Sequence, residues 1–275
     1  MINIIKDKNA LTNLLYINVA VFVFINVLKV FNYLFQNDID ISFLCISSNI
    51  SVFLKKPWTL ITYMFVHQDL FHILVNLCWL YFGGKIFINY LSTNKLVSTY
   101  LMGGISGAIL YIIAFNVFPV FETIKSASIA MGASASVLAI LVASATHVPD
   151  YPIRLFNTTI KLKYIAITAM IIDILSIPNG NAGGHIAHLG GALYGYTYIT
   201  LQKNNINTGY IIEQLMMLTS NKNQIKRKKR TESDYEYNAR KHEEEARINT
   251  ILEKISRSGY DSLSSEEKNE LFKHK

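Results

Sequence analysis

The feature that most limits how this chain can fold is a series of long apolar blocks, separated by short polar segments. A helix needs about 20 apolar residues to cross the hydrocarbon core of a bilayer. Blocks close to that length lie at about residues 14–35, 70–90, 96–118, 127–148, 160–177 and 185–201. Hydrophobic residues make up 51% of the chain, which exceeds the usual share in soluble domains. We therefore expect an all-α membrane protein, a bundle of six transmembrane helices in a lipid bilayer.

Basic residues predict the orientation of these spans, because lysine and arginine are enriched in cytoplasmic loops. The segments expected on the cytoplasmic side carry Lys6, Lys8, Lys85, Lys95, Arg154, Lys161, Lys163 and Lys203. The opposite loops hold only Lys55, Lys56 and Lys125. We expect a multi-pass protein of the cell (inner) membrane with both termini in the cytoplasm. The net charge of +7 then reflects topology, and we expect no nucleic-acid partner.

The composition changes after the last apolar block and predicts three regions. Residues 1–205 form the membrane domain, 206–231 a basic juxtamembrane linker and 232–275 a short helical cytoplasmic tail. In the tail, Ser264 and Glu267 have the spacing of a capping box that opens a helix. The first apolar block is longer than a signal-peptide core and has no small-residue cleavage motif, so we expect it to be retained.

Four polar side chains interrupt the apolar blocks at one predicted depth. His72 and Asn76 lie near the outer end of the second span, Ser134 near the outer end of the fourth, and His188 near the outer end of the sixth. Polar and ionisable groups inside a membrane are costly and usually functional. The topology therefore predicts one polar site on the extracytoplasmic side.

The residue types at this site favour nucleophilic catalysis. A serine is a poor nucleophile without an adjacent base, and His188 is the candidate base for Ser134. His72 and Asn76 are four residues apart, so they share one helix face. Both can donate hydrogen bonds to a developing oxyanion, an effect of roughly 3–4 kcal/mol per donor in soluble proteases.

Small residues supply the close approach that such a pair needs. Gly191 and Gly195 follow His188 on its own helix stripe and form a GxxxG pair, which permits close helix packing. Gly132 and its small neighbours offer the same on the fourth span. Ser136 is a rival nucleophile, but it points elsewhere on the helix, and we interpret it as a packing residue.

Three further residues leave alternatives open. His185 can share a face with His188 or lie in the loop before it, and His67 is an interfacial residue or one that helps to cap the site. Asp173 is an ionisable group within a span, but no spacing supports it as a third catalytic residue. A metal or ion site built from His67, His72, His185 and His188 is a separate hypothesis, although it lacks a well-placed carboxylate.

Three motifs on three spans give the chain a resemblance to the rhomboid family of intramembrane serine proteases. The motifs are His67…His72-x-x-x-Asn76, Gly132-Ala133-Ser134-Ala135, and Ala187-His188-Leu189-Gly190-Gly191-x-x-x-Gly195. Their order and placement cover roughly residues 10–205.

The resemblance implies a six-span bundle with a Ser134–His188 dyad in a water-filled cavity. His72 and Asn76, with the backbone N–H of Ser134, match the oxyanion site, and His67 matches a histidine at the end of the first loop. The implied activity is hydrolysis of peptide bonds in or near transmembrane segments of membrane-protein substrates. No metal and no organic cofactor is implied.

The sequence departs from the family pattern at three places. Ala135 replaces the glycine common after the nucleophile, Trp58 is followed by Thr59 where an arginine is common, and the tail has no counterpart in the minimal core. The alternative function is a catalytically inactive rhomboid-like protein that binds membrane helices in quality control. The sequence identifies neither the substrate nor a partner of the tail.

Overall fold

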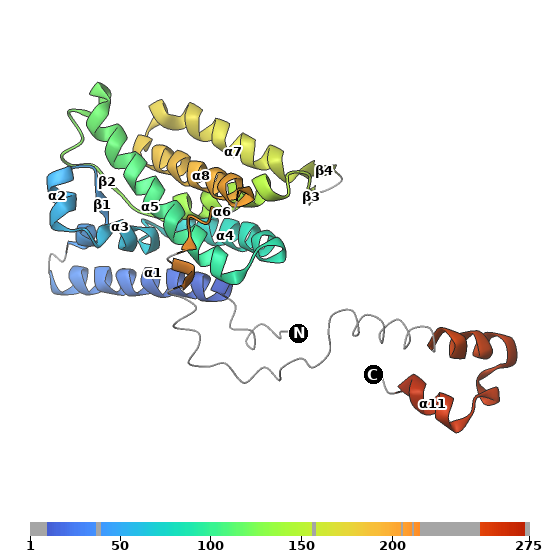
Figure 1. The fold of residues 1–275 in the computed structure, drawn as a ribbon. Helices are drawn as coiled ribbons and strands as arrows, with labels where there is room; N and C mark the ends of the chain where they lie inside the picture. Colours follow the sequence, from blue (N-terminus) through green and yellow to red (C-terminus); the bar gives the residue numbers. More distant parts are fainter. Residues whose placement is uncertain are drawn as a thin grey trace. The chain divides into compact units, whose positions relative to one another are not determined.

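The computed structural model describes residues 10–36, 40–155, 158–204, 206–210, 212–214 and 248–272. The chain divides into two compact units, residues 1–219 and 220–275. Eight α-helices of the first unit are α1 (Ala10–Phe35), α2 (Ile50–Lys55), α3 (Thr59–Thr62), α4 (Leu70–Tyr90), α5 (Thr93–Val117), α6 (Ser134–His147), α7 (Leu162–Ser176) and α8 (Ala182–Lys203) (Figure 1). Its short 3-10 helices are Ile41–Leu44, Tyr63–Phe65, Pro119–Phe121 and Ile177–Asn179.

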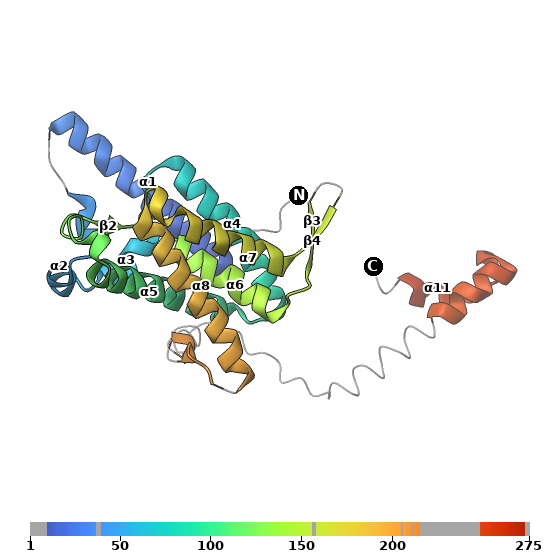
Figure 2. The ribbon, with the colours of Figure 1, turned by 90° about the horizontal axis from the view of Figure 1, so that it is seen from above.

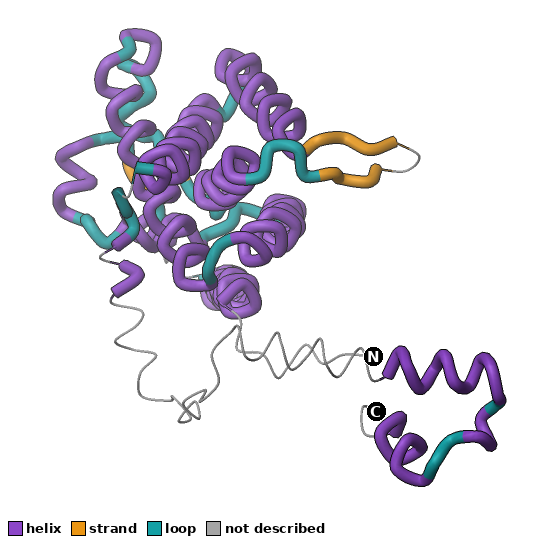
Figure 3. The backbone as a smooth tube through the Cα atoms, turned by 45° about the vertical axis from the view of Figure 1, so that its right-hand side comes forward, coloured by secondary structure: helices purple, strands orange, loops and turns teal. Residues whose placement is uncertain are grey.

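Helix α6 forms the centre of the bundle. It packs against α4, α5, α7 and α8, and Figure 2 shows these helices around it. Figure 3 shows the helices gathered side by side, with a hairpin projecting from them. That hairpin pairs β3 (Pro152–Leu155) with β4 (Thr158–Lys161) in antiparallel register.

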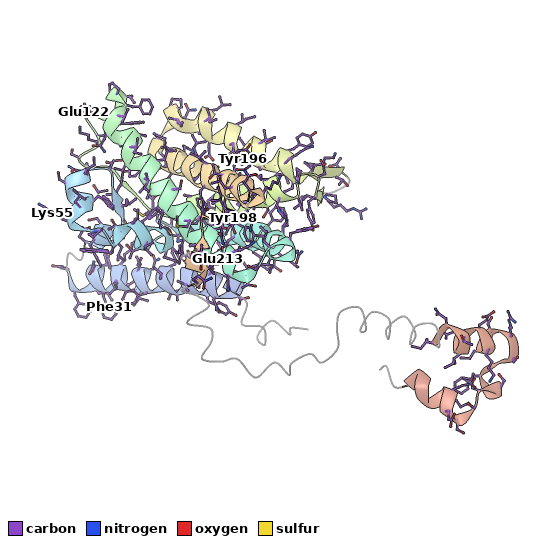
Figure 4. All side chains as sticks on the ribbon, in the orientation of Figure 1. Phe31, Lys55, Glu122, Tyr196, Tyr198 and Glu213 are labelled. Carbon is purple, nitrogen blue, oxygen red and sulfur yellow. The ribbon has the colours of Figure 1, made fainter. Side chains whose placement is uncertain are left out.

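Four helical segments in the described part of the chain are long and apolar enough to cross a membrane. They are α1, α4, α5 and Leu162–Asn179, which joins α7 to the 3-10 helix after it. Helix α6 has only 14 residues, and α8 is not among the four. Apolar side chains cover the outside of the bundle, as a lipid-facing surface requires. Phe31 on α1 is 52% exposed and points away from the bundle (Figure 4).

The composition of the fourth apolar block had suggested one continuous helix, but the structure shows otherwise. Its first part forms β2 (Ile129–Ala130), which pairs antiparallel with β1 (Ile46–Ser47). Gly132 then has a φ of +123°, a conformation that glycine adopts freely and other residues rarely do. The helix begins only at Ser134. The serine therefore lies at a helix N-terminus and not within a helix.

The segment between α1 and α4 is anchored without the arginine that the family pattern would supply. The Trp58 indole N–H donates a 2.8 Å hydrogen bond to the Phe43 carbonyl, and the Thr62 hydroxyl donates one of 2.8 Å to the Leu44 carbonyl. These bonds fasten α3 to the start of the segment.

The second unit is helical over the part that the structure describes. Residues 248–258 form one helix, a 3-10 turn follows at Tyr260–Ser262, and α11 spans Ser265–Phe272. The Ser264 N–H donates to the Glu267 carboxylate at 2.7 Å, and the Glu267 N–H donates to the Ser264 hydroxyl at 3.2 Å. These reciprocal bonds confirm the predicted capping box. Most of the predicted basic linker, and the tail from 232 to 247, lie outside the described residues.

Candidate active site

The four polar residues predicted to share one depth line a single cavity of about 470 Å³. His72 and Asn76 reach it from the start of α4, Ser134 from the start of α6 and His188 from the start of α8. Asp173, near the end of α7, lines it as well. A hydroxyl, two imidazoles, an amide and a carboxylate therefore line the same cavity.

The backbone before Ser134 presents this serine at an open helix end. Ala133 provides no side-chain cap for α6, so no capping side chain satisfies the first N–H groups of the helix. The Gly132 N–H donates a 2.9 Å hydrogen bond to the Tyr63 carbonyl, which fixes the preceding turn. An uncapped helix N-terminus favours negative charge, and the Ser134 side chain stands at that end.

His67 contacts the same turn. Its side chain is buried, and its Nε2 accepts a long hydrogen bond of 3.5 Å from the Ala133 N–H. Its Nδ1 lies 3.2 Å from the Phe65 carbonyl, so that nitrogen carries the proton. Burial, and the neighbouring His72 to a smaller extent, lower the pKa of His67 to about 4. His67 is therefore a neutral ring that positions the backbone before Ser134.

His72 lies beside the serine, and Asn76 lines the same cavity. The Asp69 carboxylate accepts a 2.8 Å hydrogen bond from the His72 backbone N–H and caps α4. A methyl group placed on Gly132 would lie 2.9 Å from His72 Nε2 and 3.7 Å from Ser134 Oγ. The glycine therefore leaves room for the His72 ring next to Ser134. The Asn76 amide donates one N–H to the His72 carbonyl at 2.9 Å and retains a second.

Asp173 is the functional candidate for which the sequence offered no supporting spacing. Its Oδ1 lies 2.8 Å from Nδ1 of His188 and 2.8 Å from Nδ1 of His185. The residue is only 7% exposed, so neighbouring helices enclose its carboxylate. Its only sequence signal is that it is the single acidic residue in a largely apolar helix.

The contact with Asp173 determines which nitrogen of His188 is free. An ionised carboxylate only accepts hydrogen bonds, so His188 must carry its proton on Nδ1. Nε2 then keeps a lone pair and can accept a proton. His185 uses the same carboxylate oxygen, but it is not among the residues that line the cavity.

Glycines bring α6 and α8 together. A methyl group on Gly191 would overlap the Ala135 carbonyl, and one on Gly195 would overlap the Ala139 carbonyl. A methyl group on Gly107 of α5 would lie 2.6 Å from the Ala135 side chain and 2.7 Å from the Ala187 carbonyl, so α5 packs closely against both helices. The helices that carry Ser134 and His188 therefore touch backbone to backbone.

Ser136, the rival nucleophile, lies in the packed core. Its side chain is fully buried, and its Oγ has no hydrogen-bond partner within the part of the chain that is described. A methyl group on Gly104 of α5 would come within 2.6 Å of that oxygen. Ser136 does not line the cavity.

Comparison with known proteins identifies the same region. The rhomboid domain family matches residues 54–204, and a family of unknown function (DUF6576) matches residues 231–274. The chain is 30% identical to RHOMBOID-like protein 12, mitochondrial, of Arabidopsis thaliana over 199 residues, which are 68% of this chain and 56% of that protein. It is 29% identical to Presenilin-associated rhomboid-like protein A, mitochondrial, of Danio rerio over 144 residues, which are 49% of this chain and 35% of that protein.

The chain thus spans about half, or less, of the length of these two relatives. The rhomboid match covers more than half of the chain and includes the elements that line the cavity. The chain belongs to the rhomboid family.

Proposed function

We propose that the protein is an intramembrane serine endopeptidase that hydrolyses peptide bonds in or near transmembrane segments of membrane-protein substrates. One observation carries the proposal. Ser134, at an uncapped helix start, shares a cavity with His188, whose Nδ1 is held 2.8 Å from the Asp173 carboxylate. This set contains a nucleophile, a base and a group that orients the base.

The proposed reaction begins with proton transfer from Ser134 to Nε2 of His188. The serine oxygen attacks the peptide carbonyl, and the carbonyl oxygen becomes negatively charged. The Ser134 N–H, His72 and Asn76 donate to that oxyanion. The intermediate collapses when His188 returns the proton to the leaving amine. Water from the cavity then attacks the acyl-enzyme, again with His188 as base, and frees the serine.

Asp173 acts in this scheme as a positioning residue. It keeps the proton of His188 on Nδ1 and holds the plane of the ring, and it does not itself take up a proton. The site is thus a Ser–His–Asp arrangement within a bundle of membrane helices.

We also propose that six helices cross the membrane, with both termini on the more basic side. Helix α6 is shorter than a lipid-facing span, but its neighbours enclose it and most of its side chains are buried. Such an inner helix does not need a full apolar surface. The names of the two relatives place those proteins in mitochondria. The proposed orientation is defined by the basic side, and it applies to a cell membrane or a mitochondrial one.

Cleavage of a single-span reporter in liposomes tests the proposal. The full chain should cleave the reporter, and Ser134→Ala should abolish cleavage without loss of the folded state. Ser136→Ala is the matched control and should retain activity, because Ser136 is buried outside the cavity. A fluorophosphonate probe should label the wild type and Ser136→Ala but not Ser134→Ala. Equal cleavage by Ser134→Ala would overturn the assignment. Absence of both cleavage and labelling in the wild type would favour the inactive, helix-binding alternative.

A further inference from the structure

A cluster of three potential metal ligands adjoins the cavity. Asp173 Oδ1 and the Nδ1 atoms of His185 and His188 all lie within 4.8 Å of one another. Among the residues that the structure describes, no other group brings three such ligand atoms this close together. His67 and His72 form a separate pair of rings, 5.1 Å apart, that does not belong to it. The carboxylate missing from the four-histidine hypothesis is therefore present, but with only two of those histidines.

The proposed protease reaction does not explain His185. One imidazole on Asp173 is enough to orient the base, yet a second ring directs its Nδ1 to the same oxygen at 2.8 Å. His185 and His188 are three residues apart on α8, so the helix places both on one face. Two imidazoles and one carboxylate converging on a point are a donor set typical of zinc and related metals.

The dimensions of the cluster suit a small divalent cation. With Zn–N bonds of about 2.0–2.1 Å, two ligand atoms of a tetrahedral site are about 3.3 Å apart. Oδ1 of Asp173 lies 2.8 Å from each Nδ1 atom, and the two Nδ1 atoms are no more than 4.8 Å apart. The ligand atoms therefore need to move apart by only about 0.5 Å to hold such an ion. The side chains of both histidines are about one fifth exposed, and Asp173 and His188 line the cavity. An ion can therefore enter from the cavity, and water can complete its coordination.

We propose that Asp173, His185 and His188 bind a divalent transition metal ion such as Zn²⁺, and that this ion inhibits the enzyme. Metal binding is independent of the proposed protease function, whereas inhibition rests on it. The ion is a regulator and not a catalytic cofactor.

The inhibition follows from which nitrogen of the neutral His188 ring carries the proton. A neutral imidazole carries one N–H proton. When the metal takes the Nδ1 lone pair, that proton must lie on Nε2. The ring passes its proton from Nδ1 to Nε2 through solvent, so no net proton is released and the carboxylate stays ionised. Nε2 then bears a hydrogen and cannot accept the proton of Ser134. The metal thus switches off the base without touching the nucleophile.

Metal binding is measured first, on the full chain with Ser134→Ala, which needs no activity. Cobalt(II) is the probe, because tetrahedral Co²⁺ absorbs visible light. We expect one Co²⁺ per chain, displaced by Zn²⁺. Adding His185→Gln should abolish the signal, because the glutamine amide can still donate to Asp173 but is a poor metal ligand. His147→Gln, which removes a histidine at the far end of α6, is the matched control and should bind normally.

Inhibition is measured second, in the reporter assay. We expect Zn²⁺ to inhibit the wild type and a chelator to restore cleavage. His185→Gln should keep basal activity within about twofold and require at least tenfold more Zn²⁺ for inhibition. Failure of Co²⁺ to bind overturns the metal site whatever the activity. Stoichiometric binding without inhibition overturns the switch. An inactive wild type that binds Co²⁺ through His185 supports the metal site and overturns the protease proposal.

Discussion

Replacement of Asp173 by asparagine tests whether this protein uses more than a Ser–His pair. The substitution conserves size and removes the charge that accepts hydrogen bonds from His185 and His188. A hydrogen bond to a charged group contributes about 1.5–3 kcal/mol, which corresponds to roughly a 10- to 150-fold change in rate. The corresponding change in a soluble serine protease costs about 10⁴-fold, because the wrong tautomer forms. We expect the lower range, because packing of α8 against α6 holds part of the orientation of His188.

The assay is the initial rate of reporter cleavage in liposomes over a range of reporter densities. Because Asp173 acts through His188, kcat should fall while KM stays within about twofold. Thermal unfolding in detergent shows whether the variant is folded. Asp150→Asn is the matched control. Its carboxylate lies 3.1 Å from Lys161 and 2.9 Å from Lys163, next to the β3–β4 hairpin and away from the cavity. It should retain activity within about twofold.

A folded Asp173→Asn protein with kcat within threefold of the wild type would refute the reasoning. It would mean that His188 keeps its tautomer and orientation without the carboxylate. Asp173 would then be a buried structural group, and the chemistry would rest on Ser134 and His188 alone. A fall in kcat and a matching rise in KM would also contradict the positioning role, because it would indicate direct contact with the substrate.

Two other perturbations test the surroundings of the serine, one by the packing of α8 on α6 and one by the protonation of His67. Gly191→Ala places a methyl group where it overlaps the Ala135 carbonyl. We expect the free energy of unfolding to fall by about 1–3 kcal/mol or more, seen as a lower unfolding midpoint. Cleavage should be lost as well. Gly83→Ala is the control, since its methyl group would meet neighbours only at 3.7 Å, and it should change neither. The depressed pKa of His67 predicts that stability falls as the pH is lowered from 6.5 to about 4, because only the unfolded chain takes up the proton in that interval. The effect is at most about 3 kcal/mol. Thermal unfolding at several pH values should show a larger loss of stability in the wild type than in His67→Gln.

The spans with a clear polar boundary were predicted well from the sequence. The second apolar block coincides with α4, Leu70–Tyr90, where Asp69 supplies the cap. The predicted start of the fourth helix was wrong. A short apolar run has the same composition in a strand and in a helix, and only the pairing of β2 with β1, a long-range contact, decides between them. The position of Ser134 at a helix start follows from that contact and from the backbone of Gly132.

The role of Asp173 could not be predicted for a related reason. It lies 15 residues before His188 and on a different helix, so no local spacing links the two. Its neighbours in the sequence are apolar, and the group that stabilises it comes from the packing of α7 on α8. Sequence reasoning identified the residue as unusual but had no means of finding its partner.

The cost of placing a carboxylate in the membrane connects the fold to the chemistry. Insertion scales assign about 2.5–3.5 kcal/mol to an acidic residue at the centre of a spanning helix. This cost is an upper limit for Asp173, which lies near the end of α7. Two charge-assisted hydrogen bonds, each of about 1.5–3 kcal/mol, are enough to offset that cost. They come from the Nδ1–H groups of His185 and His188. The bond from His188 also leaves its Nε2 unprotonated, which the proposed reaction requires, and the two bonds together gather three ligands at one point. The arrangement that makes Asp173 tolerable in the bundle is therefore also the one on which the proposed base and the proposed metal site depend.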